Sequence, residues 1–284
     1  MTLCLDPTDI VFQSFDHTEL PQPEWDTDIP HWRSYAQHLF QANGETLSLQ
    51  HDQVQAWVTS SERASFSDMI TALLPRLAAV IEPGRVKTVL MAHWTPDLHM
   101  GSSVVNAAIH QLGLSACLAL AISDRGPDAG LFALDGLNDC LAGKDEDGLL
   151  LIAEQKNLMY FSPLMAALQP ENNACVCLLN KQQRGLRYRG FRRTPVDQWS
   201  SESLLHAVEQ LGLAKERLVL IGPARLLEVA PVGTQSFAVN PHLLCAAPFV
   251  ALRTLWQPQC DYLLISENDN GISLCGLAAE EGPR

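Results

Sequence analysis

Residues 89–135, VLMAHWTPDLHMGSSVVNAAIHQLGLSACLALAISDRGPDAGLFALD, carry the pattern that decides the fold. Apolar runs at 89–92 and 117–122 predict two strands, with a helix between them. A sharp polar turn at 123–127 then leads into another helix. An elbow between a strand and a helix is where many folds expose a catalytic nucleophile. The tip of this elbow is Gly126, which offers no side chain for chemistry.

Composition limits the classes of function that the chain can have. Of its 284 residues, 47% are apolar and 18% are charged, which is typical of a well-packed globular protein. The net charge of −13 argues against a nucleic-acid or anionic-membrane partner, because both are bound through basic patches. No apolar run is long enough to span a bilayer, and the first residues lack the basic start of a signal peptide. We therefore expect a soluble, cytoplasmic protein.

The eight cysteines favour reduced thiols over disulfides or metal ligands. Most of them lie in or beside apolar runs, where buried free cysteine is common. No CxxC pair occurs, and Cys175 and Cys177 in a strand lack the usual ligand spacing. We expect no metal and no cofactor.

The rest of the chain alternates strands and helices in two unequal sets. Residues 3–14 are expected to form a first strand, and 16–64 a loop-rich, acidic wrap that packs through its tryptophans. Residues 186–191 are expected to pair with the strand at 174–179. After residue 195 the rhythm repeats in shorter form and closes with a hairpin around Asn268-Asp269-Asn270-Gly271. The pattern predicts an α/β fold with layers of helix and sheet.

Several of these features together resemble the thiolase fold, and specifically the type III ketoacyl-acyl carrier protein synthases. The helix and turn before Val89 resemble that family's lead-in, and Gln111-Leu112-Gly113 resembles its next helix end. The strand that ends at Glu154 and the terminal hairpin also match. The resemblance implies two pseudo-repeated βαβαβ halves in an α-β-α arrangement, with residues 1–195 as the first half and 196–284 as a shortened second half.

The departures from the family pattern concern its chemistry. These enzymes load an acyl group on a cysteine that lies thirteen residues beyond the glycine equivalent to Gly113, and here that position is Gly126. Residues 220–225, where the family's histidine motif should follow a strand, contain no histidine. Asn240 and His242 lie near the place of the family's asparagine, in an uncertain register. The family's glycine-rich loop corresponds to 171–175, which contains no glycine. No catalytic residue is therefore assigned.

A chain that resembles this family but lacks its catalytic residues suggests a non-catalytic subunit that completes an active partner. The chain resembles the PqsB-type small subunit of heterodimeric alkylquinolone synthases. By that resemblance it pairs with a catalytic type III synthase, to which a fatty acyl-CoA or acyl carrier protein delivers the acyl group. The expected interface and partner-tunnel residues are Leu98, His99, Met100, Asp124, Arg125 and Gly126. For Asp124 and Arg125, mutual pairing is an equal alternative.

Other interpretations stay open at this point. A self-sufficient acyltransferase or thioesterase that uses Ser123 or His242 is one, and a non-catalytic acyl-binding module is another. The only basic cluster is either a solvated hairpin edge or a contact for CoA phosphates or an acidic carrier protein. Its members are Arg184, Arg187, Arg189, Arg192 and Arg193, with Arg189, Arg192 and Arg193 as the candidate contacts.

Overall fold

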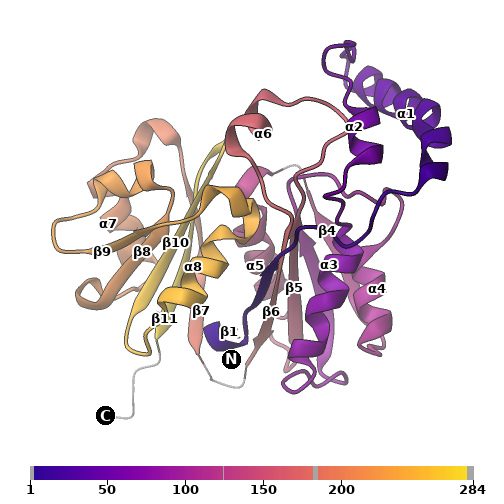
Figure 1. The fold of residues 1–284 in the computed structure, drawn as a ribbon. Helices are drawn as coiled ribbons and strands as arrows, with labels where there is room; N and C mark the ends of the chain where they lie inside the picture. The colour runs from indigo at the N-terminus through magenta and orange to yellow at the C-terminus, as the bar shows by residue number, and fades with distance from the viewer. Residues whose placement is uncertain (1–2, 124, 182–184, 280–284) are drawn as a thin grey trace.

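Two sets of strands with the same order meet along the middle of the molecule (Figure 1). The computed structural model describes residues 3–123, 125–181 and 185–279, so Asp124 and Arg184 lie outside the described residues. The first set comprises β1 (Cys4–Leu5), β2 (Val11–Ser14), β3 (Val86–Ala92), β4 (Leu118–Ile122), β5 (Asp147–Glu154) and β6 (Asn173–Asn180). The second set comprises β7 (Leu186–Thr194), β8 (Leu218–Gly222), β9 (Gln235–Ala238), β10 (Asp261–Asn268) and β11 (Gly271–Ala279).

The two sets repeat one topology. The order β1-β6-β5-β3-β4 in the first is matched by β7-β11-β10-β8-β9 in the second. In each set a central strand, β3 or β8, is parallel to both neighbours, and the adjoining hairpin-like pair, β5–β6 or β10–β11, is antiparallel. The predicted α/β fold with two pseudo-repeated halves is confirmed. The division of the chain at residue 195 stays a prediction.

The first strand of the chain joins the two sets, which corrects a predicted pairing. We expected 186–191 to pair directly with 174–179, but β1 lies between β6 and β7 and pairs with both. Pro7 begins a short 3-10 helix that separates β1 from β2, so the single strand expected over 3–14 is broken in two.

Helices cover the sheet in layers, and two of the helices, α5 and α8, belong to the inner core. The helices are α1 (Ile29–Ala42), α2 (Val54–Thr59), α3 (Phe66–Leu73), α4 (Val104–Gln111), α5 (Ala129–Cys140), α6 (Pro163–Leu168), α7 (Ser201–Gln210) and α8 (Ala247–Leu255). α5 and α8 share an inner core with residues from both sets of strands. α3 and α4 pack on the outer face of the first set, and α7 on that of the second. None of the helices in the described part of the chain is long and apolar enough to cross a membrane.

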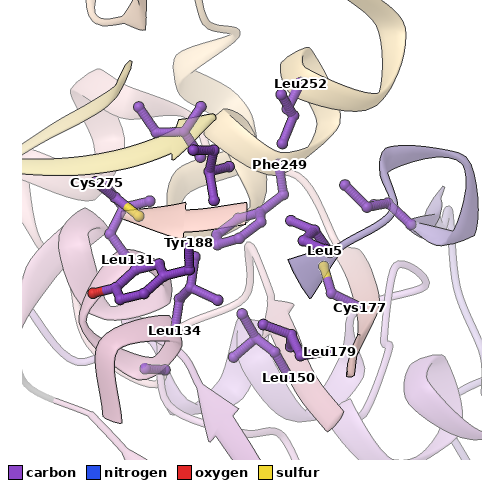
Figure 2. Packing of buried hydrophobic residues seen from close by; sticks show 14 of the residues in the cluster. Leu5, Leu131, Leu134, Leu150, Cys177, Leu179, Tyr188, Phe249, Leu252 and Cys275 are labelled. Carbon is purple, nitrogen blue, oxygen red and sulfur yellow. The ribbon is translucent and has the colours of Figure 1, made fainter. Parts of the chain in front are cut away.

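The inner core explains why the central strands are apolar throughout. Along β5, Leu150 and Ile152 face the inner core, while Leu149 and Leu151 face the outer one. A strand that is buried on both faces has no polar alternation. Figure 2 shows Leu150 of β5, Leu134 of α5 and Phe249 of α8 in this one cluster, with the Phe249 ring near its middle.

The segment 16–64 differs from the expected loop, because α1 and α2 occupy much of it. Pro30 lies in the first turn of α1, where proline is favoured because no helical N–H bond is lost there. Trp57, Ile29 and Leu98 form a separate small core under this segment. The expectation that the segment packs through its aromatic side chains agrees with that core.

Candidate functional site at the strand–helix elbow

The elbow between β4 and α5 is built around Gly126. Its φ of +72° lies in the left-handed region that favours glycine, and a short 3-10 helix, Gly126–Asp128, leads into α5. A Cβ atom at this position would lie 3.3 Å from the Cβ of Asn268 and 3.9 Å from the Trp94 ring. Neighbouring side chains therefore already occupy the space in front of Gly126.

Asn268, at the end of β10, ties the terminal hairpin to the elbow. Its Nδ2 donates to the carbonyl oxygen of Arg125 at 3.0 Å. Its Oδ1 accepts from the Arg193 guanidinium and from the Asn270 N–H, each at 2.8 Å. The hairpin turn, whose Asn-Gly signal the sequence contains, thus closes over the elbow. Sequence reasoning missed this contact because it joins residues 142 or more positions apart.

Two of the arginines predicted as contacts have different partners in the structure. Arg193 reaches the elbow through Asn268, whereas the Arg189 Nε donates to the carbonyl oxygen of Leu211, at the end of α7, at 3.2 Å. Arg192 is exposed. Their roles toward CoA or a carrier protein stay predictions.

Arg125 has a partner that the sequence analysis did not name. Its guanidinium lies 3.4 Å from the buried carboxylate of Asp128 and stacks over the Phe132 ring at 3.7 Å. Asp128 also accepts from the Ser273 hydroxyl at 2.7 Å. The i,i+3 spacing of Arg125 and Asp128 was a signal that could have found this pair.

A second elbow precedes α8 and faces the first. Leu244 adopts φ +47° and ψ −118°, three residues before α8, just as Gly126 lies three residues before α5. A positive φ is a strained backbone conformation for a leucine, and strain of this kind is concentrated at functional sites. The Cys245 thiol donates to the carbonyl oxygen of Gly126 at 3.5 Å, so the two elbows touch.

Glu154 holds the ends of β3 and β5 together beneath the two elbows. It is fully buried and accepts from the backbone N–H groups of Trp94 and Thr95, at 2.9 and 2.8 Å, and from the Thr95 hydroxyl at 2.7 Å. Burial raises the pKa of Glu154. Burial and the nearby Glu154 carboxyl raise the pKa of the Cys245 thiol well above its usual value. Cys245 is therefore a poor nucleophile.

The loop Leu98–His99–Met100 lies on the wrap formed by 16–64. Leu98 is buried there, and the three residues border a pocket of about 280 Å³ together with Trp25, Trp32, Trp57 and other residues. His99 Nε2 lies 3.1 Å from Glu19. The loop thus lines a pocket of its own chain, and its contact with a partner stays a prediction.

His99, Glu19 and Asp68 bring three possible cation ligands within 4.8 Å of one another. Glu19 is already paired with Arg63 at 2.9 Å, and Asp68 accepts from the Thr18 hydroxyl at 3.3 Å. These contacts give the cluster a structural explanation, so it does not indicate a metal centre.

Asn240 and His242 both have local partners. Asn240 Oδ1 accepts from the His242 N–H at 3.1 Å. His242 Nδ1 lies 2.8 Å from the carbonyl oxygen of Leu168 and 3.0 Å from that of Gln169, so the ring proton is assigned to Nδ1. Their shared effect is to hold the end of α6 against the segment before α8.

Comparison with known proteins agrees with this architecture at the level of fold. No family model matches the sequence, and no curated protein matches it. The fold is thiolase-like, and its structural neighbours are type III condensing enzymes. They include AbyA1, a tetronic acid condensing enzyme (TM-score 0.67, 14% identity, 99% of this chain and 100% of that chain). OleA from Xanthomonas campestris has a TM-score of 0.66 at 14% identity over 98% of each chain. β-Ketoacyl-[acyl carrier protein] synthase III (FabH) from Thermus thermophilus has a TM-score of 0.60 at 15% identity, over 77% of this chain and 85% of that chain.

Proposed function

We propose that this chain is a catalytically silent subunit that forms a heterodimer with an active type III condensing enzyme. It completes the acyl and substrate pocket of that enzyme in an alkylquinolone-like secondary-metabolite pathway. The partner holds the nucleophile and receives the fatty acyl group from acyl-CoA or an acyl carrier protein.

The observation that carries this proposal is that neighbouring side chains fill the space in front of Gly126, at the elbow between β4 and α5. Gly126 lies at the position where the family that this chain resembles has its nucleophile, and Asn268 and Trp94 occupy the adjoining space. Cys245 is the thiol next to it, and its raised pKa keeps it protonated. A site built in this way supports a structural role for the elbow better than an acyl-transfer role.

The edge of the first set of strands supports the interface. β4 is the terminal strand of its set, pairs with β3, and is apolar along its whole length, LALAI. Leu118 and Leu120 are 46% and 47% exposed. Exposed apolar edge strands are avoided in monomers because they pair with other chains. We infer that the partner covers this edge.

The alternative of a self-sufficient acyltransferase has less support. The His242 ring is engaged through Nδ1 with the carbonyl oxygens that end α6. A general base must reach its nucleophile within hydrogen-bond distance. The acylation test below separates this alternative from the main proposal.

The decisive experiment is co-expression with a type III condensing enzyme encoded beside this chain, followed by size-exclusion chromatography. Intact-mass spectrometry after incubation with fatty acyl-CoA then locates the acyl group. We expect a stable mixed complex with acyl mass on the partner alone. An isolated chain that takes up the acyl group itself would overturn the proposal.

The interface is tested by the double substitution Leu118→Glu and Leu120→Glu. Charged side chains on the exposed edge should abolish the mixed complex and leave the fold intact, because both leucines are about half exposed. Phe237→Glu on β9, the terminal strand of the second set, is the matched control and should leave the complex unchanged. Equal effects of both variants would contradict the assignment of the interface to β4.

The basic surface is tested separately through Arg192. Because Arg193 bonds Asn268, its substitution also disturbs the elbow, whereas Arg192 is exposed. Arg192→Glu should raise the KM of the complex for the acyl donor. An unchanged KM would remove Arg192 from donor delivery.

A further inference from the structure

A short apolar helix stands at the surface without burying any of its residues. α6, PLMAAL, belongs to the segment between β5 and β6 and lies above the strand ends (Figure 1). Leu164 is 51% exposed, and Phe161 just before the helix is 36% exposed. Clustered apolar exposure of this kind marks an interaction site in a folded protein.

The position of α6 is nevertheless well defined. The Ser162 hydroxyl caps its first turn by accepting from the Met165 N–H, and Pro163 takes the first helical position. At the other end, Gln169 turns the chain with φ +47°, and the His242 ring binds the carbonyl oxygens of Leu168 and Gln169. Both ends of this exposed helix are therefore anchored.

A pocket of about 620 Å³ lies beside α6 and carries an excess of negative charge. Asp16, Glu62 and Glu171 line it against one cation, Lys156, which forms an ion pair with Glu62. Glu171 accepts from the Ser14 hydroxyl at 3.1 Å, a bond that leaves its negative charge uncompensated. Phe15, Tyr160, Phe161 and Met165 supply apolar walls.

This combination of charge and shape selects the kind of occupant. The carboxylates of Asp16 and Glu171, which Lys156 does not pair, repel CoA phosphates and an acidic carrier protein, whereas they attract Lys and Arg side chains. The apolar surface also extends beyond the pocket. Phe161 is tied to the neighbouring loop by its N–H bond to the His51 carbonyl oxygen at 2.8 Å, and Leu49 in that loop is 89% exposed. A small enclosed ligand would leave this outer surface uncovered, so a protein segment fits better.

We propose that α6 and the adjoining pocket form a second contact surface for the catalytic partner, separate from the β4 edge. The surface receives an apolar side chain of that subunit flanked by Lys or Arg. This inference rests on the proposed heterodimer, and it adds the chemistry of the partner segment that the heterodimer must present.

The test measures the dissociation constant of the purified mixed complex for three variants of this chain. Leu164→Glu places a charge on the outer face of α6 and should raise the Kd roughly tenfold or more. Val196→Glu is its control, because Val196 is 48% exposed on a 3-10 turn of the second half. The third variant, Asp16→Asn with Glu171→Gln, removes two charges at nearly constant volume. It should weaken the complex at low salt and make its Kd less dependent on salt than that of the wild type.

Each outcome separates this inference from the proposed function. A complex that is weakened by Leu164→Glu and by the charge variant, and not by Val196→Glu, supports the second surface. A complex that responds to β4 substitution and not to either α6 variant overturns the second surface and leaves the silent subunit standing. Failure of the wild-type chain to bind any condensing enzyme overturns both. A charge variant that keeps the salt dependence of the wild type shows that the partner segment is not basic.

Discussion

At the scale of single residues, Gly126 combines two constraints that a nucleophile would have to overcome. Its backbone lies in the left-handed region, and Asn268 stands 3.3 Å from the place of a Cβ. Asn268 is in turn held by bonds to Arg125 and Arg193 and cannot move away freely. A side chain placed at position 126 would therefore meet both a backbone conformation that disfavours it and a neighbour that is held in place.

Gly126→Cys is therefore expected not to restore acyl transfer. The new side chain should also lower the free energy of unfolding by about 1 kcal/mol or more, because of the positive φ and the contact with Asn268. Mass spectrometry after incubation with acyl-CoA and urea denaturation measure the two effects. Gly113→Cys, at φ +63° with open space around it, isolates the backbone cost. Acylation of Gly126→Cys alone would show that the site retains its chemistry.

Glu154 gives the protein a predicted pH dependence. Because burial raises its pKa in the folded state above that in the unfolded state, its contribution to stability is fully present below the unfolded pKa. That contribution is lost as the pH rises toward the folded pKa. Glu154→Gln should cost about 1–3 kcal/mol at low pH, since one of the Thr95 and Trp94 donors loses its acceptor.

Urea denaturation of wild type and Glu154→Gln from acid to neutral pH checks this prediction. The difference in unfolding free energy between them should shrink as the pH rises, because only the wild type carries the ionisable group. A constant difference across that range would show that Glu154 does not titrate with a raised pKa.

At the scale of elements, one buried arginine organises the wrap over residues 16–64. The Arg63 guanidinium stacks on Trp25 and Trp57, at 4.5 and 5.7 Å from the ring centroids. It also donates to the carbonyl oxygens of Trp57 and Val58 and pairs with Glu19. This side chain links α2, the turn before α1 and the segment that precedes α3.

Arg63→Lys should destabilise the wrap by roughly 1–3 kcal/mol, because an ammonium cannot stack flat and donate in several directions at once. Tryptophan fluorescence during urea denaturation follows the loss, since Trp25 and Trp57 both report on this contact. Arg76→Lys, on the exposed side of the turn after α3, is the matched control. Equal stability of the two variants would contradict the role given to Arg63.

At the scale of the whole molecule, both faces of the central strands are buried. The burial of the cysteine thiols depends on where each lies in these layers. All eight cysteines lie in the described part of the chain as thiols outside any disulfide, with Cys117, Cys140 and Cys260 partly accessible and the others buried. Burial also raises the pKa of Cys177 and Cys275.

A thiol reagent such as DTNB should therefore modify at most three cysteines in the native protein and all eight in concentrated guanidinium chloride. The five buried thiols (eight cysteines minus the three accessible ones) should react with the reagent only as fast as the protein unfolds. Rapid native reaction of more than three thiols would show that the layered core opens more easily than its packing implies.

The sequence by itself determined the alternation of strands and helices, the elbow at Gly126 and the terminal hairpin. These features depend on local periodicity, turn chemistry and the presence or absence of a side chain, and all of them are written in neighbouring residues. Local reasoning failed for α1, which lies in the segment expected to be loop-rich and carries Pro30 in its first turn.

Only the tertiary structure decided what each of these elements meets. β1 inserted between β6 and β7, Asn268 closed over Gly126, Cys245 met Glu154, and α6 kept its apolar side chains at the surface. These contacts join residues far apart in the chain, and their energies depend on burial and distance. The physical reason is that a local pattern specifies which face of an element is apolar, whereas the partner of that face is chosen by the packing of the whole chain.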